Sequence, residues 1–157
     1  MKKRILLVCF LVAGYVTANA QFASLSNDEF AKLKDLIANN ASAEAAFTPF
    51  KTMAEKALTE QPDPIEKITT EGKLAGDPDK IKTIKAVEDA RKIYAMALVY
   101  KLYGNKTYLT KTSEYLQAWA RINESTGDPI DETRLEELIA GYDIVRDEVT
   151  ADVKKSR

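Results

Sequence analysis

The sequence "LVYKLYGNKTYLTKTSEYLQAWARIN", residues 98–123, contains two helical patterns separated by Gly104-Asn105. The first pattern ends at Gly104, and glycine commonly follows the last turn of a helix. The second places Tyr108, Thr112, Tyr115 and Trp119 at intervals of three or four positions, which is the spacing of one helix face. Because the connection is so short, the stretch predicts two antiparallel helices joined as a hairpin.

Helical periodicity continues on the N-terminal side of this hairpin. Ser26 and Glu29 match a capping box, and Asn39-Asn40 is expected to end the helix that follows. Thr48-Pro49 is expected to begin the next helix, with proline at the first helical position. The inner face expected for that second helix consists of Phe50, Met53, Ala54, Ala57 and Leu58.

Residues 60–78, "EQPDPIEKITTEGKLAGDP", interrupt the periodicity with three prolines and two glycines, so they predict a long loop. Asp77-Pro78 then predicts the start of a third helix. Within it, "IYAMALVYKLY" is apolar around most of the helix circumference, which predicts packing on more than one side. The stripe expected along this helix consists of Ile81, Ile84, Val87, Tyr94, Ala97, Leu98 and Leu102.

A turn at residues 124–129 is expected to lead into a last helix. Its inner face is predicted to carry Leu135, Leu138, Ile139, Tyr142, Val145 and Val149. No stretch alternates with period two for long enough to predict a strand. The sequence therefore predicts an all-α fold of antiparallel helical hairpins.

Residues 1–20 have the pattern of a secretory signal peptide. Lys2, Lys3 and Arg4 precede an apolar run over residues 5–16, and Ala18-Asn19-Ala20 forms a small-residue cleavage site. We therefore expect a periplasmic or secreted protein, with one domain over residues 21–157 and no stable membrane anchor after cleavage. Removing the three leader cations reduces Lys plus Arg from 23 to 20 against 24 acidic residues, for a net charge of −4. This balance gives no sign of nucleic-acid binding.

The composition excludes several kinds of chemistry. The sequence contains no histidine, and its single cysteine, Cys9, lies in the predicted leader. Nucleophilic Ser-His and Cys-His sites are therefore excluded, and so are zinc sites built from Cys and His. Residues 77–80, "DPDK", fit a helix cap better than a calcium loop. We predict no metal site and no cofactor.

Aromatic residues and loop lysines remain as candidate binding groups. Trp119, Tyr142, Tyr108 and Tyr115 could form a surface on which sugar rings stack, or they could be core residues on helix stripes. Lys67 and Lys73 lie on the proline-rich loop, where they could bind an acidic polymer or remain solvated. The candidate substrate-binding residues are therefore Lys67, Lys73, Trp119 and Tyr142.

Residues 89–122, "DARKIYAMALVYKLYGNKTYLTKTSEYLQAWARI", resemble a helix pair of the alginate lyase family and its polysaccharide-lyase relatives. Those proteins carry an Ala-rich helix, a short turn with Gly and an acidic residue or Asn, then a Tyr and a helix ending in Ala-Trp-Ala. Residues 50–58 and 127–147 resemble further segments, so the resemblance covers about residues 48–149. The matching residues of the helix pair are Ala95, Ala97, Leu98, Gly104, Asn105, Tyr108, Leu116, Ala118, Trp119 and Ala120.

The resemblance implies an (α/α) toroid, a ring of helical hairpins around a cleft, with residues 60–78 as a loop near that cleft. It also implies β-elimination on an acidic, uronate-containing polysaccharide. The family's Asn and Arg neutralise the substrate carboxylate, and its His or Tyr transfers protons. This sequence has no His and no Asn-Asn-His type motif, so no catalytic residue carries over.

The expectation from these departures is an N-terminal part of an incomplete toroid, a lyase fragment that lacks the catalytic motif. Two alternatives stay open. One is a periplasmic helical module that binds carbohydrate or protein without catalysis, and the other is a degenerate lyase that binds polyuronates without cutting them.

The signal peptide leads to a prediction about export. Intact-mass analysis of the secreted or periplasmic fraction should find a chain that begins at Gln21. A chain in that fraction that retains Met1 or Lys2 would contradict cleavage after Ala20.

Overall fold

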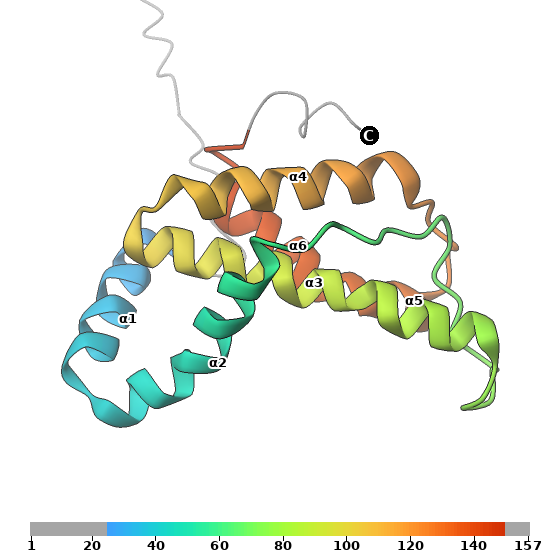
Figure 1. Ribbon diagram of the computed structural model, residues 1–157, viewed down its shortest axis with the longest axis horizontal. Helices are drawn as coiled ribbons and strands as arrows, with labels where there is room; N and C mark the ends of the chain where they lie inside the picture. Colours follow the sequence, from blue (N-terminus) through green and yellow to red (C-terminus); the bar gives the residue numbers. More distant parts are fainter. Residues whose placement is uncertain (1–24, 150–157) are drawn as a thin grey trace, which may run out of the picture.

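The computed structural model describes residues 25–149, so the predicted signal peptide lies outside the described residues. Those residues form helices and loops without a strand, which confirms the all-α prediction. Figure 1 shows α3 and α4 running side by side in opposite directions, as predicted from residues 98–123. Closure into a toroid stays a prediction. The helices are α1 (Asn27–Asn39), α2 (Ala41–Ala57), α3 (Pro78–Tyr103), α4 (Lys106–Ile122), α5 (Pro129–Glu132), a 3-10 turn η1 (Thr133–Leu135) and α6 (Glu136–Val145).

A single residue, Asn40, connects α1 to α2. The predicted capping box of α1 is present, because Ser26 Oγ accepts from Glu29 N and the Glu29 carboxylate accepts from Ser26 N. Asn40 ends α1 and also caps α2, since its side-chain oxygen accepts from Ala43 N at 3.0 Å. One side chain therefore sets the end of one helix and the start of the next.

The predicted start of the second helix at Thr48-Pro49 is wrong, because Pro49 lies inside α2. Residues 41–46 are rich in alanine, the strongest helix former, and they extend the helix by two turns before the proline. Proline has no N–H for the carbonyl of residue 45. Thr48, just before it, donates its hydroxyl to the carbonyl of Glu44 at 2.9 Å.

Helix α3 is the centre of the fold, and it packs against α2, α4 and α6. This confirms the prediction that a helix apolar on several faces packs on more than one side. The buried residues of its second half are Ile93, Ala95, Met96, Ala97, Leu98, Val99 and Leu102. Gly104, with φ of 76°, ends α3 in the left-handed conformation that favours glycine.

The first half of α3 faces the core differently from the prediction. Ile81 and Ile84 are 54% and 42% exposed, whereas Thr83 and Ala86 are buried. The cause is the loop between α2 and α3, which lies against this part of the helix. Its Thr69 N donates to Thr83 Oγ1 at 3.3 Å, so the face of α3 that carries Thr83 and Ala86 is buried in place of the face that carries Ile81 and Ile84.

The C-terminal segment forms three short elements where one helix was predicted. Asp128 caps the short α5, a 3-10 turn follows, and α6 ends at Val145. Val149 is buried as predicted, but it lies beyond the end of α6. Ile139 was expected on the inner face and is exposed instead.

Gly141 sets the distance between α6 and α3. A Cβ atom placed there would lie 2.8 Å from Ile93 Cγ2 and 3.0 Å from the backbone N of Tyr94. Contacts that short do not occur at real Cβ atoms, and the backbone of a central helix cannot easily shift. Glycine therefore lets the two helices approach closely.

We predict that Gly141→Ala lowers the free energy of unfolding by about 1–3 kcal/mol, because a methyl group overpacks this contact. Chemical denaturation followed by circular dichroism measures the change. Gly76→Ala is the matched control, since its Cβ would meet nothing within 4 Å. Equal effects of the two substitutions would show that close packing at residue 141 is unimportant.

Candidate functional site

A buried carboxylate lies where the loop, α3 and α4 meet. Asp89 of α3 is 1% exposed, and its Oδ2 atom accepts from Trp119 Nε1 at 3.1 Å and from the backbone N of Asp63 at 2.7 Å. Its Oδ1 atom accepts from Lys92 Nζ at 3.1 Å. A buried carboxylate is tolerated only when it is paired and hydrogen-bonded, and these three donors meet that need.

Lys92 extends this cluster to the end of α2. Its Nζ atom lies 3.0 Å from Glu60 Oε2 and 5.9 Å from the centroid of the Tyr115 ring. Burial lowers the pKa of Lys92, but hydrogen bonds to Glu60 and Asp89 outweigh this and leave the pKa above its ordinary value. The ammonium group therefore stays charged at neutral pH.

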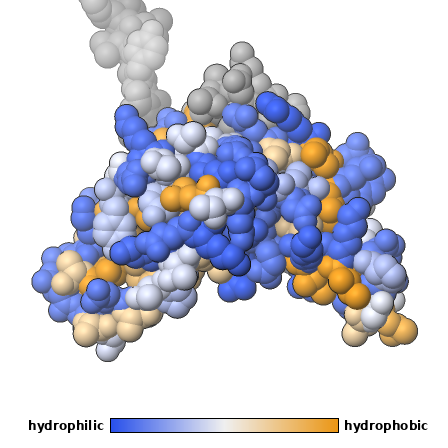
Figure 2. All heavy atoms as spheres, in the orientation of Figure 1, coloured by the Kyte–Doolittle hydropathy of each residue, from blue (hydrophilic) through white to orange (hydrophobic). Residues whose placement is uncertain are grey.

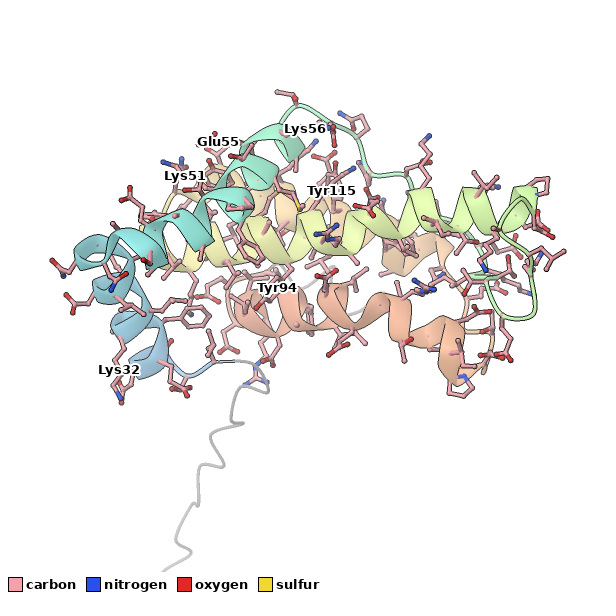
Figure 3. The ribbon with its side chains drawn as sticks, turned by 90° about the horizontal axis from the view of Figure 1, so that it is seen from below. Lys32, Lys51, Glu55, Lys56, Tyr94 and Tyr115 are labelled. Carbon is pink, nitrogen blue, oxygen red and sulfur yellow. The ribbon has the colours of Figure 1, made fainter. Side chains whose placement is uncertain are left out.

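Tyr115 is the fourth titratable group of the cluster, after Asp89, Lys92 and Glu60. Its side chain is fully buried, and its hydroxyl has no hydrogen-bond partner among residues 25–149. Burial raises the pKa of Tyr115 to about 12, although the charge of Lys92 opposes the shift. Lys111 Nζ also lies 5.6 Å from the ring centroid. The phenol therefore keeps its proton at neutral pH and can act as a donor, not as a base. Figure 3 places Tyr115 near the C-terminal end of α2, where Lys56 is labelled.

The loop between α2 and α3 is fixed to the helices at three places. Its first part is held by Asp89 through Asp63 N. Its middle is held by the two residues that follow α4, because Asn123 Nδ2 donates to the Ile65 carbonyl at 3.1 Å and Glu124 N donates to the Glu66 carbonyl at 2.7 Å. Ile65 and Ile68, which belong to this part of the loop, have buried side chains. This part of the loop therefore belongs to the core.

The third attachment is the carboxylate of Asp131 in α5, which is buried. Its Oδ1 atom accepts from Thr70 N at 2.8 Å, from Thr70 Oγ1 at 2.5 Å and from Glu71 N at 3.1 Å. Burial raises the pKa of Asp131, but the bonds from Thr70 and Glu71 outweigh it and hold the pKa below its ordinary value. The loop position therefore depends on an ionised Asp131.

The comparison with protein families assigns the sequence to a family. The sequence model described as "Alginate lyase" matches residues 32–154, which is most of the chain. This chain belongs to the alginate lyase family. Searches of curated proteins and of solved structures find no match. In this family member, no helix of residues 25–149 combines the length and apolar character needed to cross a membrane.

In the structure, the four predicted substrate-binding residues lie on three different elements, namely the loop between α2 and α3, α4 and α6. Lys67 is exposed on the loop, and Lys73, farther along it, has its Nζ atom 2.7 Å from Asp79 and 3.3 Å from Asp77. Tyr142 is partly buried on α6 and packs against the core. Trp119 is 2% exposed and bonded to Asp89, so its ring belongs to the core, the alternative that the helix stripe left open.

Sequence analysis of this family member missed Asp89 and Asp131. Asp89 lies three positions after Ala86 and four before Ile93, so it occupies a core position of the helix pattern. The helix pattern therefore carries a signal for the burial of Asp89, although acidic residues are mostly exposed. Asp131 gave no signal, because its partners are 60 and 61 residues away in the chain. Among the residues that the structure describes, no group of His, Cys, Asp or Glu is placed to hold a metal ion.

We predict that Asp131→Ala releases the loop around Thr70. The substitution leaves two backbone N–H groups without an acceptor, so amide exchange at Thr70 and Glu71 should rise by about tenfold or more, equivalent to about 1–3 kcal/mol. Exchange measured by nuclear magnetic resonance tests this. The pKa of Asp131 is depressed in the folded state, so the stabilisation is complete above the unfolded-state pKa and is lost as pH falls through the folded-state pKa.

Asp147→Ala is the control for this substitution, because Asp147 is an exposed carboxylate beyond the end of α6. It should leave exchange at Thr70 unchanged. Unchanged exchange in Asp131→Ala as well would show that the other two attachments hold the loop without this carboxylate.

Proposed function

We propose that this chain acts on a uronate-containing polysaccharide as the helical scaffold of a polysaccharide lyase that cleaves by β-elimination. Membership of the alginate lyase family over residues 32–154 is the observation that carries the proposal. The proposal includes export to the periplasm or beyond the cell, which the leader sequence supports and where a polymeric substrate would be met.

β-Elimination on a uronate makes three demands on an enzyme. A group must neutralise the carboxylate next to the reacting carbon, a base must remove the proton, and an acid must protonate the leaving oxygen. The sequence has no histidine to serve as base. Tyr115 keeps its proton because burial raises its pKa to about 12, and its buried hydroxyl does not reach a bound polymer.

We therefore propose that this chain does not cleave polyuronates on its own. Its contribution would be a rigid helical support and surface groups that contact the polymer. Lys67 is exposed and suited to such contact, whereas Lys73 would have to exchange its ion pairs with Asp77 and Asp79 for a substrate carboxylate. A contact by Tyr142 would use the exposed part of its ring.

A second candidate function is carbohydrate binding without catalysis. The absence of histidine and the protonated state of Tyr115 favour it, because both remove a base without affecting the surface. Binding of an unmodified polyuronate oligosaccharide without formation of an unsaturated product would support this alternative.

We predict that the purified chain, incubated with alginate, glucuronan or a heparin-like polymer, gives no rise in the ultraviolet absorbance of the unsaturated product. A known polyuronate lyase in the same buffer is the positive control. A robust rise that is lost in Tyr142→Phe or Tyr108→Phe would contradict the prediction and place a tyrosine-based site in this chain.

A further inference from the structure

A groove of about 430 Å³ lies between α1, α2 and the last turn of α3. The three elements meet at one end of the molecule (Figure 1). Ile37 and Phe47 line it and are buried, while Tyr103 lines it and is 50% exposed. The rings of Phe47 and Tyr103 lie 6.2 Å apart at their centroids. Its size is that of sites for small ligands, and Tyr103 gives it an accessible aromatic wall.

Four charged side chains line the same groove without pairing. Lys34 comes from α1, and Lys51, Glu44 and Glu55 come from α2. All four are exposed, and none forms an ion pair with another residue of the described chain. Lys51 and Glu55 are four positions apart, the spacing that favours an ion pair, and they lie on the same side of α2 (Figure 3). Two cations and two carboxylates are thus left with free hydrogen-bonding capacity.

We propose that this groove binds one uronate residue of an acidic polysaccharide. The sugar carboxylate would pair with Lys34 and Lys51, and its hydroxyl groups would donate to Glu44 and Glu55. The face of the ring that carries C–H bonds would lie against Tyr103. A uronate can use the cations, the acceptors and the aromatic face together. This inference rests on the proposed function, because that function supplies the polymer.

A second groove does not have the same character. It has a volume of about 550 Å³ and runs along α3, η1 and α6. Glu88, Glu136 and Glu137 line it against Arg91 and Arg134, so the local charge is negative. An anionic sugar would be repelled there. Figure 2 shows that hydrophilic surface predominates on the face in view. Both grooves have an aromatic wall, Tyr103 in the first and Tyr94 in the second, so the balance of charge is what distinguishes them.

The test is a calorimetric titration of the full chain with an alginate tetrasaccharide at low salt. The double variant Lys34→Met, Lys51→Met should raise Kd by about tenfold or more, because two charge-assisted contacts are lost. Tyr103→Ala should also weaken binding. Lys82→Met is the matched control, since Lys82 is an exposed lysine of α3 without an ion pair, and it should leave Kd within about twofold. Circular dichroism verifies that each variant keeps its helix content.

The possible failures are distinguishable. If the chain binds the tetrasaccharide but the double variant binds as tightly as Lys82→Met, the groove is not the binding site, and the proposed function stands. Equal binding of an uncharged tetrasaccharide would also overturn the uronate proposal. If the chain binds no uronate oligosaccharide at any salt concentration, both the groove proposal and the proposed function fail.

Discussion

Most of the structure depends on the need to satisfy one buried carboxylate. Asp89 lies in the central helix, where water cannot solvate it, so its hydrogen bonds must come from the protein. The donors belong to three different elements, namely the loop, α3 and α4. Through Lys92 the same network reaches Glu60 just after α2. Removing any donor would leave part of a buried charge unpaired, so the network fixes how these elements meet.

The same logic extends along the loop between α2 and α3. A loop with so many prolines and glycines has little structure of its own, and its ordered path comes from polar groups on the helices. Asp89, Asn123 and Asp131 hold successive parts of it, while Ile65 and Ile68 bury apolar surface beneath it. The loop is thus fixed as far as Glu71, whereas Leu74, farther along, is exposed.

Family membership and side-chain chemistry give complementary information about function. The family relates the chain to enzymes that act on acidic polysaccharides, while the residues decide which steps it can perform. The sequence has no histidine, and the most perturbed tyrosine is buried and protonated. The unpaired charges and the aromatic wall of the groove at Tyr103 are instead accessible. The accessible charged and aromatic groups therefore lie at the surface, and the buried, protonated Tyr115 is not among them.

The sequence by itself determined the local features of this protein. Three kinds of signal were sufficient for the all-α class, the central hairpin and the long loop: capping at Ser26 and Asp77, the glycine at residue 104, and the spacing of apolar residues. These signals can be read locally because each acts over one or two helical turns. Helix α2 shows the limit, since an alanine-rich run outweighed a proline signal. Only the tertiary structure decided that Trp119 points to Asp89, that Asp131 holds Thr70, and that Lys34 and Tyr103 share a groove. Those pairings join residues 30 to 69 positions apart, and nothing in the local pattern specifies which distant groups a helix face will meet.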